Sequence, residues 1–251
     1  MSKAGSRDHY SYTHYADPAN AGSFDRRRFG GAIGRMIASE QARVLANFAG
    51  AIRDLSILDV GTGTGRAAIL MARGGARVTA VDPSEAMLAI ARRRAGDESL
   101  AITFAAGDAH QLEFRDQAFD VVISLRVLMH AADWQAALAE LCRVAGRLVI
   151  VDYPSASSLA RLQSIGRRIT HACGARTEPY RVFHHTEIAR ELTKAGFRIR
   201  SEHRQFVLPI ALHKAIGSPV LSTFTRSVSY RLGLLRRFGS PVTLVAERWT
   251  F

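Results

Sequence analysis

The chain has 251 residues, of which 47% are hydrophobic and 22% charged, and a mean hydropathy of −0.01, which predicts one sizeable globular domain. No apolar run approaches the ~20 residues of a membrane-spanning helix, and the N-terminus lacks a signal-peptide core; this excludes an integral membrane protein and favours the cytoplasm. The two cysteines, Cys142 and Cys173, lack metal-ligand spacing and are interpreted as reduced thiols.

Charge is unevenly distributed along the chain. The 34 Lys and Arg exceed the 22 Asp and Glu by 12. Residues 1–154 hold 18 of these bases and 17 of these acids, so residues 155–251 hold the remaining 16 bases and 5 acids, a net charge of +11. No acid lies between Glu202 and Glu247. The basic excess therefore describes a C-terminal surface and not the fold.

The first 30 residues are polar and aromatic and contain the basic run Arg26-Arg27-Arg28. A helix is predicted at about 34–49, because Ile37, Val44 and Phe48 recur on one face.

A short apolar strand at 56–60 runs into a turn that is rich in glycine. One acid and three glycines form the pattern D-x-G-x-G-x-G: Asp59, Gly61, Gly63 and Gly65. A dinucleotide-binding G-x-G-x-x-G would need its third glycine at Arg66, so that alternative fails. The pattern resembles motif I of the class I S-adenosylmethionine (SAM)-dependent methyltransferases. The resemblance implies that these four residues, together with Thr62, bind the cofactor SAM.

A second apolar strand, at 77–82, ends in an acid, and Ser84 is placed to cap the helix that follows. A carboxylate at the end of this strand can accept hydrogen bonds from both hydroxyls of a ribose, and the family resemblance assigns this role to Asp82. In the family, residues just after this acid pack against adenine. The resemblance therefore adds Pro83 and Met87 to the cofactor-binding residues.

The third strand, at 101–105, is followed by Asp108 and Ala109. In the family, this acid and the next backbone amide read the edge of adenine. A fourth strand, at 119–124, leads into Ser124-Leu125-Arg126, which the resemblance places beside the sulfonium end of SAM. Ser124 is therefore also predicted to bind the cofactor.

Strands alternate regularly with helices through this part of the chain. The helices are expected near 65–74, 84–95 and 133–145, and a fifth strand near 147–152. This order predicts an α/β fold with a doubly wound, mostly parallel sheet that binds its ligand at the carboxyl ends of the strands. The resemblance implies a Rossmann-like sheet of seven strands with an N-terminal helical lid. Residues 1–251 are interpreted as one domain, with the lid at 1–50, a SAM-binding core at 51–154 and a substrate-side part at 155–251.

The substrate-side part departs from the family pattern. A helix is predicted at 155–172, a shorter one before Gly196, and strands at 197–208 and 241–248. A basic helical insertion at about 209–239 separates these two strands, which form a hairpin in the family. Three interpretations of the insertion remain open: a packed helix with solvated arginines, a lid over an amphipathic substrate, and peripheral contact with an anionic membrane.

His130 is the candidate catalytic residue, because it follows the fourth strand and an ordinary imidazole titrates near pH 6.5. The alternative is that His130 and Asp133 cap or orient the next helix. His184, His185 and His213 are further candidates in segments expected to border the acceptor site. No cluster of carboxylates or cysteines accompanies them, so no metal is expected.

The predicted activity is methyl transfer from SAM to a small, lipophilic or aromatic acceptor, with S-adenosylhomocysteine as product. Within the family, the chain resembles the type 11 methyltransferases of ubiquinone and menaquinone biosynthesis over about 56–152. A nucleic-acid methyltransferase is one alternative, but its N/D-P-P-Y/F tetrad is replaced here by Ser124-Leu125-Arg126-Val127. A non-catalytic SAM-binding protein of a membrane surface or a partner is the other. The sequence does not indicate an oligomeric state.

Overall fold

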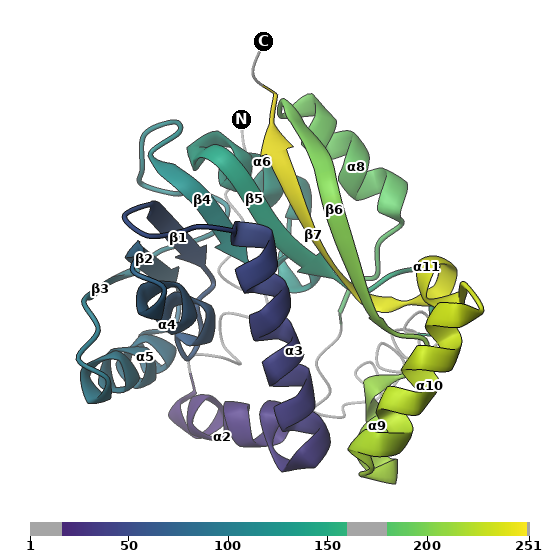
Figure 1. Ribbon diagram of the computed structural model, residues 1–251. Helices are drawn as coiled ribbons and strands as arrows, with labels where there is room; N and C mark the ends of the chain where they lie inside the picture. Colours follow the sequence, from purple (N-terminus) through teal and green to yellow (C-terminus); the bar gives the residue numbers. More distant parts are fainter. Residues whose placement is uncertain (1–16, 160–179, 250–251) are drawn as a thin grey trace.

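The computed structural model describes residues 17–159 and 180–249. Its centre is a sheet of seven strands in the order β3-β2-β1-β4-β5-β7-β6 (Figure 1). The strands span β1 Ser56–Val60, β2 Arg77–Asp82, β3 Ile102–Ala106, β4 Phe119–Ser124, β5 Ala145–Tyr153, β6 Phe197–Phe206 and β7 Ser240–Arg248. β1 to β5 are parallel, and β7 runs antiparallel between β5 and β6. The predicted seven-stranded, mostly parallel α/β sheet is confirmed.

Helices cover both faces of this sheet. α3, α4 and α5 lie on one face, and α6 and α8 on the other (Figure 1). Their bounds are α3 Gly31–Ala49, α4 Arg66–Arg73, α5 Glu85–Asp97, α6 Trp134–Val144 and α8 His185–Lys194. Alternate residues of the central strands face opposite layers, so that Ile57 packs in the core beneath α4 and Leu58 in the core beneath α6. Both side chains are fully buried, which fixes the register of β1 and therefore the position of the turn that follows it.

The N-terminal part contains a helix that the sequence interpretation did not anticipate. α2, Pro18–Phe29, begins at Asp17, whose side chain accepts a hydrogen bond from the Ala19 amide at 2.8 Å. Asp25 of α2 accepts a hydrogen bond from the Thr64 hydroxyl at 3.1 Å and pairs with Arg94. These contacts hold α2 against the glycine turn and α5, across the carboxyl ends of the strands.

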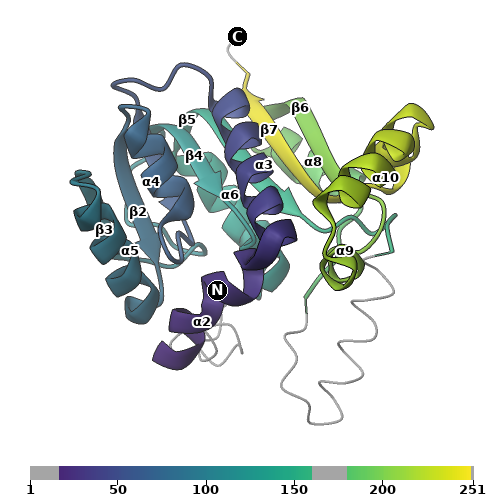
Figure 2. The same ribbon diagram turned by 60° about the horizontal axis from the view of Figure 1, so that its bottom comes forward.

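Two expectations for the C-terminal part need correction. No helix begins at Ser155: its Oγ accepts a hydrogen bond from the Ser157 amide and its carbonyl one from the Ser158 hydroxyl, and these bonds close a turn over 155–158. The remainder of the predicted helix, and Cys173, lie outside the described residues. The insertion contains the expected short helix at 210–216, α9 Ile210–Ile216, which ends at the left-handed Gly217. Its longer helical stretch, expected over 219–237, is instead divided into α10 Pro219–Arg231 and α11 Leu234–Phe238, because Gly233 adopts a left-handed conformation that does not continue a helix. Figure 2 shows α9 and α10 beside the edge of the sheet formed by β6 and β7.

Within residues 17–159 and 180–249, no helix combines the length and the apolar character needed to cross a bilayer.

Candidate functional site

The glycine turn leaves β1 in a conformation that side chains with a Cβ would disrupt. Gly61 has a φ of 70°, and a Cβ added there would lie 2.2 Å from Cγ2 of Val127. The amides of Gly61 and Thr62 both donate to the Val81 carbonyl of β2, at 2.8 and 3.0 Å. The turn is thereby held against the neighbouring strand. Gly63 also has a positive φ, of 54°, but a Cβ there would meet nothing within 4 Å, so its backbone faces open space in the pocket.

Asp59 lies behind this turn and supports it. Its Oδ2 accepts hydrogen bonds from the Thr62 hydroxyl at 2.6 Å and from the Ala68 amide of α4 at 3.1 Å. The side chain is only 2% exposed, and burial raises the pKa of Asp59 to about 6 against the opposing effect of these hydrogen bonds. Asp59 therefore joins the turn to the first turn of α4, and it does not line the pocket.

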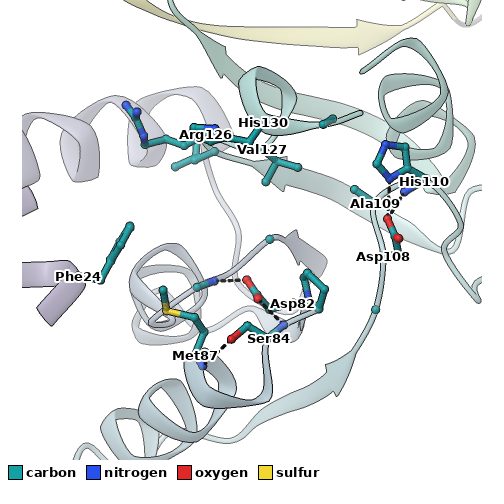
Figure 3. Close-up of a pocket in the computed structure, with 16 residues that line it drawn as sticks. Phe24, Asp82, Ser84, Met87, Asp108, Ala109, His110, Arg126, Val127 and His130 are labelled. Carbon is teal, nitrogen blue, oxygen red and sulfur yellow. Dashed lines mark hydrogen bonds and ion pairs between the residues drawn. The ribbon is translucent and has the colours of Figure 1, made fainter. Parts of the chain in front are cut away.

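Asp82, unlike Asp59, faces the pocket (Figure 3). Its Oδ2 accepts a hydrogen bond from the Gly63 amide at 2.8 Å, and its Oδ1 accepts one from the Ser84 amide at 2.9 Å. Burial raises the pKa of Asp82 to about 6, and the two amide hydrogen bonds oppose this shift. Each oxygen is fixed by one backbone donor and keeps acceptor capacity for a ligand on the pocket side.

The pocket itself lies at the carboxyl ends of β1, β2, β3 and β4. Its empty volume of about 890 Å³ includes a part open to solvent. Eight of the residues singled out from the sequence line it: Gly61, Gly63, Asp82, Pro83, Met87, Asp108, Ala109 and His130. Four others lie outside the lining: Asp59, Thr62, Gly65 and Ser124. Ser124 is fully buried, and its hydroxyl donates to the Val60 carbonyl at 3.0 Å, so it joins β4 to β1.

Two aromatic side chains in the lining were missed by the sequence interpretation. Phe24 reaches the pocket from α2 (Figure 3), and only the tertiary position of α2 reveals it. His110 follows Asp108 by two residues: its Nδ1 lies 2.7 Å from Asp108 Oδ1, and its Nε2 accepts from the Asp133 amide at 3.3 Å. The hydrogen bond with Asp108 raises the pKa of His110. The Asp-x-His spacing was a signal that could have identified this pair.

His130 ends the short 3-10 helix η1, Leu128–His130, and lines the pocket. Asp133 accepts a hydrogen bond from the Ala136 amide at 3.0 Å and is the N-cap of α6. The capping role considered for the two residues thus falls to Asp133.

The other three histidines lie elsewhere. His184 is the N-cap of α8, His185 lies 2.9 Å from the Tyr153 hydroxyl, and His213 is buried 2.9 Å from the Ser222 hydroxyl. None of them lines the pocket. In the described part of the chain, no three metal-ligating side chains come together.

A second, more polar cavity lies beyond Arg126, which lines both spaces. Arg126 has a positive φ of 65°, and its amide donates to Asp152 Oδ1. Burial raises the pKa of Asp152, and the Arg126 charge opposes this. Across the cavity, Glu40 pairs with Arg226 and lies 3.0 Å from His203 Nε2. Burial alone would raise the pKa of Glu40, but the His203 hydrogen bond and the nearby cations outweigh it and lower the pKa.

The sheet order, the glycine turn and the pocket at the strand ends are arranged as in the class I methyltransferase fold. Residues 58–150 match the family described as "Methyltransferase domain".

Comparison with individual proteins agrees with this assignment. The chain is 43% identical over 103 residues to a demethylmenaquinone methyltransferase of Thermus thermophilus, which covers 39% of this chain and 47% of that protein. It is 42% identical over 91 residues to a ubiquinone biosynthesis O-methyltransferase of Maricaulis maris, covering 36% of each. The chain thus spans less than half the length of these relatives. A magnesium protoporphyrin IX methyltransferase from Synechocystis, solved with S-adenosylhomocysteine, shares the fold with a TM-score of 0.63 at 22% identity over 94% of this chain and 99% of that one.

Proposed function

We propose that this protein transfers the methyl group of SAM to a small, lipophilic or aromatic acceptor and releases S-adenosylhomocysteine. The observation that carries the proposal is the pocket carboxylate of Asp82, held by the amide of the glycine turn at the strand ends. The match of residues 58–150 to the methyltransferase domain supports it.

The residues present fit SAM. In the proposed arrangement the two ribose hydroxyls donate to Asp82, because each of its oxygens is already oriented by one backbone amide. The adenine packs on Met87 and Pro83 and meets Asp108 and Ala109 at its edge. The absence of a side chain at Gly63 leaves room for the amino-acid part of SAM against the backbone. All these groups line one pocket.

Methyl transfer from SAM mainly requires the protein to position the donor and the acceptor. The sulfonium of SAM carries an activated methyl group, which moves to the acceptor by in-line displacement while the sulfur keeps the bonding electron pair as a thioether. The protein contributes by holding donor and acceptor at near-attack distance and by excluding water. Where the acceptor atom carries a proton, that proton must leave with methylation. We propose that the neutral imidazole of His130 accepts it, since His130 lines the pocket.

The acceptor is proposed to enter past Arg126, from the second cavity. Arg126 borders both spaces, and its backbone is fixed by Asp152. A lipophilic acceptor is favoured by the relatives, which are named for demethylmenaquinone and for ubiquinone biosynthesis. Such an acceptor is concentrated in membranes, and we propose that the protein works in the cytoplasm with peripheral contact to an anionic membrane.

The test uses SAM labelled on its methyl group. The protein is incubated with an extract of the source cell, and the products are partitioned between organic solvent, water and acid precipitate. Label in the organic phase that, at limiting SAM, is strongly reduced with Asp82→Asn and retained with the exposed-surface control Asp97→Asn supports the proposal. Label confined to the acid precipitate would point to a nucleic acid or protein acceptor and refute a small lipophilic one. Binding of SAM without transfer under any condition would favour a non-catalytic protein.

A further inference from the structure

Helix α10 faces its own protein with the polar side and solvent with the apolar side. Val220, Phe224 and Val228 are four residues apart and form one stripe, with exposed fractions of 80%, 63% and 38%. The opposite side carries Ser222, which is 1% exposed, and Arg226. A helix that only packs on a globular domain shows the reverse pattern. The orientation of α10 therefore indicates that its apolar side serves a partner.

Specific polar contacts fix this orientation. Arg226 pairs with Glu40 of α3, a side chain that is only 7% exposed. The Ser222 hydroxyl lies 2.9 Å from Nδ1 of the buried His213 in α9. Turning the apolar stripe inward would break both contacts and leave the Glu40 carboxylate buried without Arg226, which is strongly unfavourable. The stripe is therefore held outward by the fold.

The neighbouring segments extend the apolar character of this region. Twelve large hydrophobic side chains are exposed in the described part of the chain, and ten of them belong to residues 212–238, so they are concentrated and not scattered. Outside the stripe and its neighbour Leu221, the ten include Leu212, Ile216, Tyr230, Leu232, Leu234 and Phe238. We refer to the exposed side of α9–α11 as the helical docking surface.

The positive charge around the helical docking surface indicates the kind of partner it binds. Between residues 203 and 246 the chain has six Lys and Arg and no Asp or Glu. Three of them, Arg231, Arg236 and Arg237, are exposed, whereas Arg226 pairs with Glu40. Apolar side chains that insert among lipids, bordered only by cations, match the anionic surface of a membrane.

Helix α9, which carries part of the helical docking surface, also adjoins the proposed acceptor route. Ile210, the first residue of α9, lines the second cavity. Lys214 of α9 donates to the carbonyls of Arg27 and Arg28 at 2.8 and 2.7 Å, and these hydrogen bonds join α9 to the end of α2. Figures 1 and 2 show α9 on the same side of the molecule as α2 and the lower end of α3. The inner side of α9 therefore borders the second cavity, and the helical docking surface lies on the outer side of the same group of helices.

We propose that the helical docking surface binds the protein peripherally to an anionic lipid membrane, with the apolar stripe of α10 inserted and Arg231, Arg236 and Arg237 at the headgroups. The contact requires neither SAM nor methyl transfer.

Flotation of the full chain with lipid vesicles tests the proposal. We expect binding to vesicles of equal parts phosphatidylglycerol and phosphatidylcholine and none to phosphatidylcholine alone. Raising salt from about 0.15 to about 1 M shortens the Debye length from ~8 to ~3 Å and should weaken binding markedly. The double variant Arg236→Glu/Arg237→Glu should lower the bound fraction by about tenfold or more. Arg115→Glu/Arg200→Glu, at two exposed positions outside the helical docking surface, is the charge-matched control and should leave binding within about twofold of the parent.

The apolar contribution is tested by Val220→Ser/Phe224→Ser. This variant should lose vesicle binding by about tenfold or more and keep the unfolding midpoint and SAM affinity of the parent, because both side chains face solvent. Equal binding by this variant, or by the double arginine variant, would overturn the proposal. Failure of the parent to bind anionic vesicles would also overturn the proposal. In that case, concentration-dependent self-association that Phe224→Ser abolishes would identify a second copy of the chain as the occupant of the surface. SAM affinity, measured on the same samples, separates this outcome from failure of the proposed function.

Discussion

Replacement of Asp82 by Asn tests the centre of the site with little change in shape. The carboxylate accepts from the Gly63 amide at 2.8 Å and the Ser84 amide at 2.9 Å. The Asn side chain has one oxygen and one NH₂ group, so one of these amides loses its acceptor and one ribose hydroxyl faces a donor. Hydrogen bonds to charged groups contribute about 1.5–3 kcal/mol each. We expect SAM binding to weaken by about 2–3 kcal/mol, or about 30- to 150-fold in Kd.

The pH dependence makes this prediction more specific. In the free protein, burial raises the pKa of Asp82 from 3.8 to about 6. Because the ribose hydroxyls need the carboxylate as acceptor, acidification below about pH 6 should weaken SAM binding, approaching tenfold per pH unit. Asp82→Asn should show no such dependence. Isothermal titration calorimetry between pH 5 and pH 8, with Asp97→Asn as the exposed control, measures both effects.

The folding stability should respond to Asp82→Asn differently from the SAM affinity. A carboxyl group with a raised folded-state pKa stabilises the fold below its unfolded pKa, and this contribution is lost as the pH rises through the folded value. For Asp82 this contribution is lost between about pH 4 and pH 6, and the rise of its pKa from 3.8 to about 6 corresponds to about 3 kcal/mol of folding stability. At pH 7.5, Asp82→Asn should therefore melt no lower than the parent by calorimetry. Unchanged SAM affinity in a folded variant would refute the ribose assignment, and a large fall in melting temperature would refute the assigned desolvation.

Three further substitutions test the rest of the site. Gly61→Ala should destabilise the fold by about 1–3 kcal/mol in chemical unfolding, because its Cβ would lie 2.2 Å from Val127 and its φ is positive; Val127→Ala should restore part of the loss, and an effect below about 0.5 kcal/mol would contradict the geometry. Glu40→Gln should lower the stability of the fold by about 1–3 kcal/mol at pH 7 and make α10 more sensitive to proteolysis, because Arg226 loses its charged partner. The pKa of Glu40 is lowered in the folded protein, so the difference in stability between parent and variant should vanish as the pH falls through this lowered pKa. His130→Gln should reduce kcat/KM by about 10²–10⁴-fold for a proton-bearing acceptor with SAM affinity nearly unchanged; retained single-turnover transfer would exclude His130 as the base.

The sequence predicted those parts of the fold and site that depend on short-range order. The β–α alternation and the glycine turn place Gly61 and Asp82 at the ends of two adjacent strands, and this placement does not depend on the C-terminal part of the chain. Asp59 is the penultimate residue of β1 and Asp82 the last residue of β2, and the two acids have different positions. Asp59 turns back beneath the glycine turn toward Ala68, whereas Asp82 faces the pocket. The acids are offset by one residue relative to the ends of their strands, and the turns that follow take different paths.

The parts that the sequence missed depend on tertiary packing or on local signals that were passed over. The Asp17-Pro18 pair marks the start of α2 by its N-cap and first-turn proline, but the contact of Phe24 with the pocket depends on how α2 crosses the strand ends. Ser124 was assigned to the ligand from the family resemblance, and the sequence did not indicate that its hydroxyl donates to the Val60 carbonyl. Gly233 breaks the insertion because its left-handed conformation does not continue a helix.

The pairing of β6 with β7 makes the insertion a separable module. Phe206 and Ser240 are partners in the ladder, so residues 207–239 leave the sheet and return to it at neighbouring points, as the loop of a hairpin does. A short turn could replace these residues without altering the order of the strands or the lining of the SAM pocket. The small cluster of Ile33, Ile37 and Phe206 that α9 helps to cover would then need polar substitutions. The proposed docking surface can thus change by insertion or loss of one segment, while the residues proposed to bind the methyl donor stay the same.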